Sequence, residues 1–318
     1  MNVFKKNLNV ADMKNGDAVE GFYLLKTAKM KTTGSGKPFL DCDVSDRSGV
    51  IKGVFWDFND ATLASEAAGC AVFLRGNISM YNDLMQVVLV ELRKPEQGEN
   101  VDISKLVPTA PIVVDEELGK INSYIASMTD PDYKKIAVEM LKRHKNTFKQ
   151  IPAAKGVHHA FVNGLLMHTG TMLAHADCVA ALYPVINRDL LFAGVMCHDL
   201  AKDREYKFTE LGLATDFTVD GNLLGHLVMG AEEIGRVGRE LNLPEEKIML
   251  LQHMLLSHHG QPEWGAAVYP KIVEADALHL IDNMDAHMES YRETLEGMNV
   301  GEMSTTRVCT GQYCYKHG

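Results

Sequence analysis

The sequence has few cysteines and no long hydrophobic run. Six cysteines stand among 318 residues and none forms a paired CxxC motif, which excludes a disulfide framework or a zinc ribbon and predicts free thiols in a reducing compartment. No stretch of about 18 uncharged apolar residues occurs, and no apolar run follows the N-terminal lysines. We therefore predict a soluble, cytoplasmic protein that does not contact a membrane.

An excess of basic residues is also missing. The net charge of −10 excludes a protein that coats duplex nucleic acid by charge alone, because such binding depends on clustered lysine and arginine. Histidine is absent from the first 143 residues, whereas all 13 histidines lie between His144 and His317. The length predicts two domains, and this partition indicates that they differ in chemistry.

The first part of the chain has the pattern of a small antiparallel β domain. Between Asp17 and Leu92, five short apolar runs are separated by turn residues, and NDATLASEAAG after the third run predicts a short helix capped by Asn59 or Asp60. Five strands with a helix after the third are typical of an all-β OB-fold barrel, which we place at residues 10–95. Such a barrel could bind a single strand. The candidates for base stacking are Phe39, Trp56 and Tyr81, each with a place in the barrel core as an equal alternative, and those for phosphate contacts are Lys26, Lys29, Lys31 and Lys37.

The rest of the chain is predicted to be helical. Residues 96–112 carry glycine, proline and charges and suit a linker, after which apolar residues recur every three to four positions across residues 113–300. This spacing predicts an all-α helical bundle, apart from a hairpin-like insertion at REYKFTELGLATDFTVDGN. Residues 301–318 form a C-terminal tail.

Histidines and aspartates set into apolar segments predict a metal site. His198 and Asp199 are adjacent on a predicted helix, and burying such a pair is costly unless a cation compensates. The other members of the set lie on separate segments that must converge, as in helical-bundle metal sites; they are His168, His226, His258, His259 and Asp282. A bridging carboxylate with imidazoles on either side is the ligand set of a mono- or dinuclear hydrolytic centre.

Other residues around this set are assigned weaker roles. Lys202 follows His198 by four positions, so on a continuous helix its ammonium would lie on the same face and favour an anionic substrate such as phosphate. His158 and His159 could line the pocket without binding metal. The remaining histidines are interpreted as ordinary surface or core residues.

These motifs together resemble a known family. CHDLAKD resembles the HD-x-G-K signature of the HD phosphohydrolase superfamily, and the chain from about residue 10 to 298, including HHAFVNGLLMHT, LLSHHG and EADALHLIDNMDA, is similar to the YhaM-type exoribonucleases. The resemblance implies an OB fold followed by an HD domain that degrades RNA from its 3′ end with a divalent metal. Manganese is the expected ion, with iron, magnesium, nickel or cobalt as alternatives.

The resemblance also implies roles for single residues. His168, His198, Asp199 and Asp282 would hold one ion, and Asp199 would bridge to a second; the ligands of the second are His226, His258 and His259. Asp199 and Lys202 are thus the predicted catalytic residues, with Lys202 at the scissile phosphate. Met167 stands where many relatives have Glu, and Ala201 where the motif usually has Gly.

We therefore expect a metal-dependent hydrolase of phosphodiesters that acts on single-stranded RNA from the 3′ end, with single-stranded DNA as a further partner and a homo-oligomeric assembly. The enzymatic alternative is an HD-domain hydrolase of nucleotides or cyclic dinucleotides. The non-enzymatic alternative is an OB-fold protein that binds single strands and keeps its HD domain as a structural element.

Overall fold

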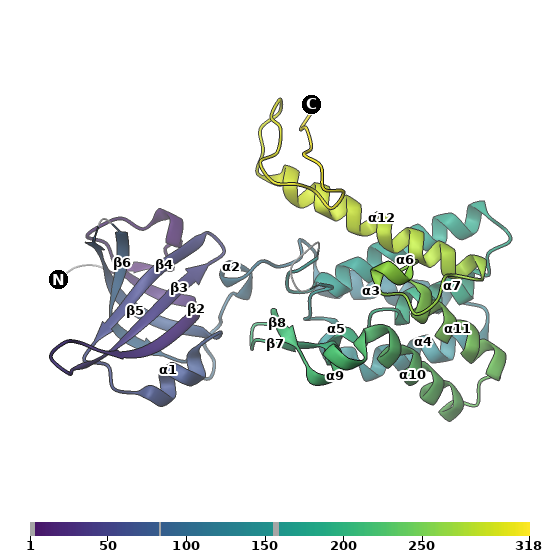
Figure 1. Cartoon of the computed structure of the whole chain (residues 1–318), viewed down its shortest axis with the longest axis horizontal. Helices are drawn as coiled ribbons and strands as arrows, with labels where there is room; N and C mark the ends of the chain where they lie inside the picture. Colours follow the sequence, from purple (N-terminus) through teal and green to yellow (C-terminus); the bar gives the residue numbers. More distant parts are fainter. Residues whose placement is uncertain (1–3, 83, 155–158) are drawn as a thin grey trace. The chain divides into compact units, whose positions relative to one another are not determined.

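The chain folds into two units. The computed structural model describes residues 4–82, 84–154 and 159–318, so His158 lies outside the described residues. Unit 1 comprises Met1–Thr109 with Thr209–Leu211, and unit 2 comprises Ala110–Phe208 with Gly212–Gly318 (Figure 1). Within the described part of the chain, no helix combines the length and the apolar character needed to cross a bilayer. All six cysteines are free, as predicted.

Unit 1 is a closed five-stranded barrel. The strands pair in the order β2-β3-β4-β6-β5, and β5 pairs back with β2, while the short β1 (Lys5–Lys6) adds to β2 in parallel. Alternating side chains of β3 such as Leu40, Cys42 and Val44 are buried in the barrel, as expected for period-two strands. The barrel strands are β2 (Ala18–Thr32), β3 (Pro38–Asp46), β4 (Gly49–Trp56), β5 (Ala71–Tyr81) and β6 (Leu84–Arg93).

The helix predicted between the third and fourth strands is present. Helix α1 (Ala61–Ala67) connects β4 to β5, and the Asp60 carboxylate accepts a hydrogen bond from the Leu63 backbone N–H at 2.8 Å. Such an N-cap satisfies a donor that the helix itself leaves unpaired. The helix and its aspartate cap are therefore confirmed.

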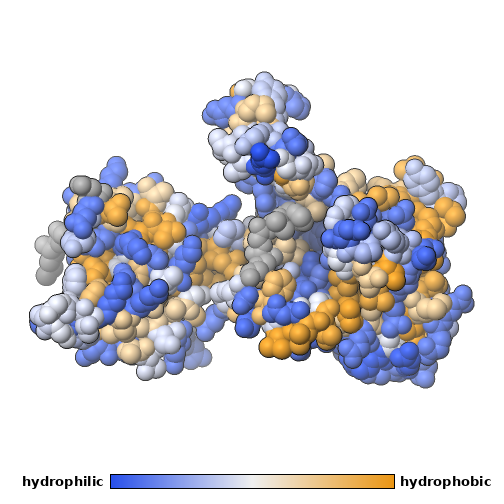
Figure 2. Space-filling model, in the orientation of Figure 1, coloured by the Kyte–Doolittle hydropathy of each residue, from blue (hydrophilic) through white to orange (hydrophobic). Residues whose placement is uncertain are grey.

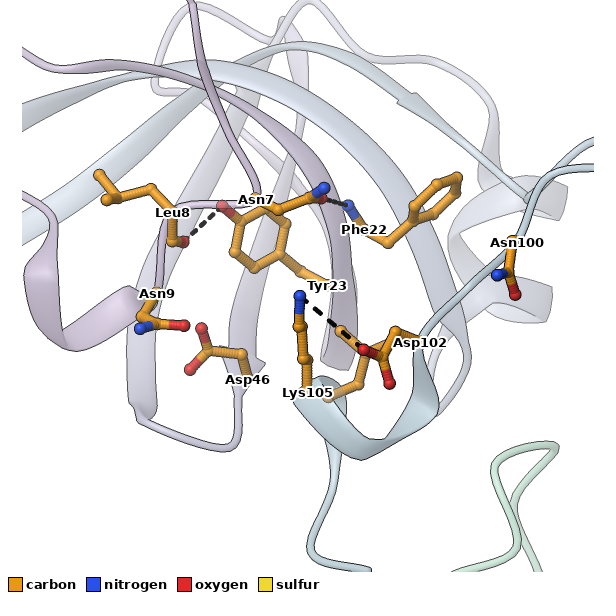
Figure 3. A pocket seen from close by; sticks show the side chains of 10 residues that line it. Asn7, Leu8, Asn9, Phe22, Tyr23, Asp46, Asn100, Asp102 and Lys105 are labelled. Carbon is orange, nitrogen blue, oxygen red and sulfur yellow. Dashed lines mark hydrogen bonds and ion pairs between the residues drawn. The ribbon is translucent and has the colours of Figure 1, made fainter.

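Part of the predicted linker is folded against the barrel. Helix α2 (Ile103–Leu106) lies in the predicted linker and buries Leu106, and the Arg47 backbone N–H donates to the Lys105 carbonyl at 2.8 Å. A further short element of this unit, the 3₁₀ turn η1 (Val10–Asp12), precedes β2. Figure 3 shows the small polar pocket there, where the Tyr23 hydroxyl donates to Leu8 O at 2.7 Å.

Unit 2 is helical around one large apolar core. Helix α7, whose residues 189–197 are all buried, packs against α4, α6, α11 and α12. A two-stranded hairpin of β7 (Tyr206–Phe208) and β8 (Ala214–Phe217) interrupts the helices where the insertion was predicted, so the unit is not purely α-helical. The helices are α3 (Val114–Ser127), α4 (Pro131–Arg143), α5 (Lys145–Phe148), α6 (Gly164–Leu182), α7 (Arg188–Cys197), α8 (Lys202–Glu205), α9 (Val219–Leu223), α10 (Gly225–Glu240), α11 (Glu245–Ser257) and α12 (Val273–Glu296).

The C-terminal tail is ordered on itself. Beyond α12, Met303 and Tyr315 form an antiparallel bridge, and Ser304, Val308 and Cys314 are buried. The tail thus forms a small folded loop at the end of α12 (Figure 1).

Candidate metal centre

Asp199 lies at the centre of the histidine cluster and is 3% exposed. Its two carboxylate oxygens face different imidazoles. Oδ2 lies 3.3 Å from His198 Nε2 and 3.9 Å from His168 Nε2. Oδ1 lies 3.4 Å from His226 Nε2 and 3.7 Å from His258 Nε2. The carboxylate therefore stands between two groups of side chains.

Each of these groups could hold a metal ion. In the first, one ligand atom from each of His168, His198 and Asp282 lies within 4.8 Å of the others, and His168 Nε2 is 3.3 Å from Asp282 Oδ1. The second group satisfies the same 4.8 Å limit and comprises His226, His258 and His259. Helices α6, α10 and α12 supply three of these residues, and the turns that follow α7 and α11 supply the others, so segments up to about a hundred residues apart in sequence converge here.

Hydrogen bonds on the far side of the rings aim the imidazoles at the centre. In three of the imidazoles, Nδ1 lies within hydrogen-bond distance of a backbone carbonyl that is near in sequence, so Nε2 points toward the centre. The pairs are His198 with Val195 O at 2.8 Å, His258 with Leu255 O at 2.7 Å and His259 with Trp264 O at 3.0 Å.

The two remaining imidazoles are held by carboxylates that the sequence reasoning missed. His226 Nδ1 lies 2.9 Å from Glu205 Oε1, and His168 Nδ1 lies 2.6 Å from Asp285 Oδ2. Asp285 is three residues after Asp282 on α12 and so on the same helix face, a spacing that could have identified it. Glu205 gave no such signal, because only the fold brings it to a histidine 21 residues away.

His159, predicted to line the pocket, joins this outer layer. Its Nε2 lies 2.8 Å from the same Asp285 Oδ2 that pairs with His168, and the side chain is buried. Asp285 therefore links two imidazoles, of which His168 alone faces Asp199.

Several polar atoms at the centre are buried and unpaired. Among the described residues, these include the Nε2 atoms of His198, His226 and His258 and the Oδ1 atom of Asp199. Leaving such atoms without partners costs free energy, whereas nitrogen and carboxylate ligands facing one point suit a transition-metal ion. The residues present therefore fit a divalent metal.

The charges of the centre are strongly perturbed. Burial by itself would raise the pKa of Asp199, but nearby His198 and Lys202 hold it well below its usual range. Burial keeps the pKa of His258 well below the ordinary value, so this ring is neutral and able to bind a cation. Burial alone would lower the pKa of His168. The carboxylates of Asp282 and Asp285 have the larger effect and raise this pKa to about 10. A cation at this site competes with a proton on His168.

The profile of the HD domain matches residues 165–287, a range that spans every residue of both metal-site groups. The 3'-5' exoribonuclease YhaM of Halalkalibacterium halodurans is 37% identical over 289 residues, covering 91% of this chain and 89% of the relative. The enzyme of the same name from Bacillus subtilis is 38% identical over 287 residues, with 90% of each chain covered. The chain belongs to the YhaM family. Among solved structures, the second OB-fold domain of replication protein A from Methanococcus maripaludis is similar with a TM-score of 0.23 and 12% identity, over 30% of this chain and 100% of that one.

One local prediction about this YhaM-family site is wrong. Helix α7 ends at Cys197 and α8 begins at Lys202, so His198 and Lys202 do not share a continuous helix. Asp199 instead lies in the turn between these helices. The Lys202 ammonium still reaches the centre, because it donates to Asp199 Oδ2 at 2.6 Å and to Ala153 O at 2.7 Å.

An apolar surface adjoins the second group of this YhaM-family centre. Leu224 lies two residues before His226, and it is exposed together with Val219 and Leu223 of α9. Figure 2 shows this apolar surface over α9. Exposed apolar side chains therefore closely precede His226 in sequence.

Two of the three aromatic candidates on the barrel of this YhaM-family chain lie together. Phe39 and Trp56 are cross-strand neighbours on β3 and β4 with ring centroids 5.0 Å apart, and Trp56 is 49% exposed. Tyr81 is 64% exposed but lies at the β5–β6 turn. Because Gln86 of β6 pairs with Lys52 of β4, this turn lies at the opposite end of β4 from Trp56.

The four candidate lysines of the barrel are exposed, but acidic residues accompany them. Lys31 is paired with Asp41, and Lys37 Nζ lies 3.5 Å from Asp57 Oδ1. Lys29 is the cross-strand neighbour of Asp41, and Lys26 sits at the irregularity in β2 between Leu25 and Thr27. The barrel face is therefore mixed in charge, in contrast to a uniformly basic groove.

Proposed function

We propose that this protein is a metal-dependent 3'-5' exoribonuclease that acts on single-stranded RNA. The observation that carries the proposal is the Asp199 carboxylate, whose two oxygens face separate groups of buried imidazoles. Membership of the YhaM family supplies the reaction class. The imidazole-rich ligand set is typical of transition-metal sites. Manganese is proposed because the family resemblance implies it, with iron, magnesium, nickel or cobalt as alternatives.

Each group would hold one divalent ion. His168, His198 and Asp282 would bind the first and Asp199 would bridge to the second; the second ion's further ligands are His226, His258 and His259. When bound, such ions supply an activated water and neutralise charge on the phosphoryl oxygens. No nucleophile from the protein is required.

Lys202 is proposed to act on the substrate. Its ammonium is held between Asp199 Oδ2 and Ala153 O, and the side chain is 13% exposed, so a phosphate at the centre can reach it. A fixed cation at this place would stabilise the charge that develops on the phosphoryl oxygens. It also holds Asp199 ionised and oriented toward both groups.

The barrel is proposed to bind the strand as an OB fold does. The exposed Trp56, with the half-buried Phe39 beside it, offers a surface for base stacking, and the surrounding lysines could contact phosphates. Because paired bases cannot stack on such a surface, we expect single-stranded RNA to be preferred over a blunt duplex, with single-stranded DNA as a weaker substrate. Homo-oligomer formation remains a prediction.

The test compares substrates with metal content measured alongside. The purified protein is expected to contain divalent metal by elemental analysis and to convert 5′-labelled RNA oligomers into a descending ladder of products. Internal fragments appearing first would contradict exonucleolytic action. Consumption of nucleotides or cyclic dinucleotides with RNA left intact would establish the phosphohydrolase alternative. Absence of both metal and hydrolysis would favour the binding-protein alternative.

A further inference from the structure

We propose that Trp264 is a stacking platform for the base of the terminal nucleotide that the metal centre cleaves. This inference rests on the proposed exoribonuclease function and adds a binding residue outside the metal-site set. Trp264 closes the 3₁₀ turn η2 (Pro262–Trp264), five residues after His259.

A hydrogen bond ties Trp264 directly to the metal centre. Its backbone carbonyl lies 3.0 Å from Nδ1 of His259, whose ring is 4.5 Å from that of His258 and 5.2 Å from that of His226 by centroid. The tryptophan is therefore one hydrogen bond away from a member of the second group. This loop is therefore the part of the chain that would border a nucleotide whose phosphate lies at the second group.

The loop that carries Trp264 is firmly built. Trp264 N donates to Gln261 O at 2.9 Å, and Ala267 N donates to Leu256 O at 2.9 Å, which ties the loop back to α11. Gly260 (φ +81°) and Gly265 (φ +99°) take the left-handed conformations that the loop needs, and a Cβ at Gly260 would clash with the His279 ring. The position of the tryptophan is thus determined by the backbone around it.

The indole itself remains available to a ligand. It is 55% exposed, and its ring neighbour His279 lies 5.9 Å away by centroid with an interplanar angle of 33°. His279 is fixed in turn by its Nδ1, which lies 2.9 Å from the carbonyl of His258. The large aromatic surface is therefore backed by a held imidazole and still faces solvent, which is the arrangement of an aromatic that binds rather than one that packs.

A nucleobase is the ligand that this surface fits. Every base presents a π face, so stacking on tryptophan tolerates any sequence, as an exonuclease that removes successive nucleotides requires. Base–aromatic stacking contributes about 1–3 kcal/mol per base when measured by alanine substitution, which corresponds to roughly 5- to 150-fold in affinity.

The experiment is a double-mutant cycle in the full-length, metal-loaded enzyme, in which the tryptophan is substituted and the terminal base of the RNA is removed, separately and together. Trp264→Ala should raise KM for single-stranded RNA by roughly 5- to 150-fold, while Trp264→Phe keeps most of the affinity. An RNA whose 3′-terminal nucleotide is abasic should bind the wild type more weakly, and Trp264→Ala should weaken it no further. Tyr269→Ala removes an aromatic of similar exposure, 53%, in the same chain segment and serves as the matched control.

The outcomes separate this inference from the proposed function. If the wild type cuts RNA and Trp264→Ala has an unchanged KM, the stacking role of Trp264 is contradicted and the exoribonuclease function stands. An equal loss for normal and abasic RNA, or a loss of metal from Trp264→Ala, overturns it as well, because the residue would then act through His259. If the wild type cuts no RNA, the proposed function fails, and the platform fails with it.

Discussion

At the residue scale, the proposed chemistry depends on how Asp199 presents its two oxygens. A carboxylate with imidazoles on either side can bridge two cations, and a carboxamide of the same shape cannot, because its nitrogen carries protons and no charge. A buried carboxylate such as that of Asp199 is costly as an isolated charge. A cation bound beside it would remove this cost and so stabilise the site.

Asp199→Asn is therefore expected to lose metal and activity together. Metal content should fall toward zero by elemental analysis, and turnover of RNA should drop by about 10²-fold or more. Asp115→Asn, an exposed aspartate on α3, is the control and should change neither. Full metal content with full turnover in Asp199→Asn would place the centre elsewhere.

Lys202→Ala should separate chemistry from metal binding. The lysine contacts Asp199 and is not itself a ligand, so metal content should stay nearly intact while kcat falls by about 10²-fold, the scale of one electrostatic donor. Circular dichroism verifies folding. An unchanged kcat on RNA oligomers would return Lys202 to a structural role.

Asp285→Asn tests the carboxylate behind His168. The substitution keeps an oxygen that can accept a hydrogen bond but removes the negative charge behind the ring, and such outer partners typically contribute 10- to 100-fold to metal affinity. We expect metal affinity in a competitive chelator titration to fall by about that factor, with the protein still folded. Unchanged affinity would show that His168 needs no such partner.

At the element scale, the four-residue helix α8 has to be held by side chains, because so short a helix is not stable alone. Its Asp203 carboxylate lies 2.7 Å from His144 Nδ1 and accepts from the Thr147 hydroxyl at 2.9 Å. His144 Nε2 lies 3.3 Å from Glu233 of α10. This cluster anchors the helix that carries both Lys202 and Glu205, so an histidine interpreted as ordinary in sequence supports the site from behind.

The cluster also predicts a pH dependence of stability. Burial alone would lower the pKa of His144. The carboxylates of Asp203 and Glu233 have the larger effect and raise this pKa from 6.5 to about 9. The protonated ring therefore stabilises the fold fully below about pH 6.5, and this contribution is lost as pH rises through about 9. Arg204 and Arg236, which pair with Glu233, moderate the effect.

Urea unfolding of the metal-free protein from pH 6 to 10 measures this contribution. Relative to wild type, His144→Gln should be less stable by roughly 2 to 3 kcal/mol at the acidic end, and the difference should shrink toward high pH. His317→Gln, at an exposed position, should follow the wild-type curve. A difference that is constant over this range would show that His144 is neutral in the folded state.

At the scale of the whole molecule, the two units have separate apolar cores. One is built from barrel residues such as Val19, Leu40 and Leu74, and the other from helical residues such as Ile136, Leu191 and Leu278. Each core is buried within its own unit, so each unit has the means to fold by itself.

A chain that starts at Ala110 should therefore fold, bind metal and hydrolyse a small generic phosphodiester. It should bind long single-stranded RNA more weakly than the full chain, because the Phe39–Trp56 face is gone. Fluorescence anisotropy with a labelled oligomer measures the loss, and circular dichroism verifies the helical fold. Equal affinity of the two proteins would show that the barrel does not hold substrate, and would strengthen the nucleotide-hydrolase alternative.

Much of this architecture is present in local patterns. Alternating burial, turn residues and the Asp60 cap specify the strands and α1, because each depends on neighbours close in sequence. The candidate metal-site residues could be selected for a similar reason, because a histidine or aspartate within an apolar segment is conspicuous wherever it lies. His226 and Asp282 are examples, since each lies among apolar neighbours in the sequence.

Tertiary structure alone decided how these residues meet. Only the fold shows that Asp199 lies in a turn with one oxygen toward each group, that Glu205 and Asp285 hold the rings behind them, and that Tyr81 is far along the barrel from Trp56. The physical reason is the distance along the chain over which each effect acts. Propensity and burial act over a few residues, whereas a site is made by side chains whose distance depends on how whole helices pack.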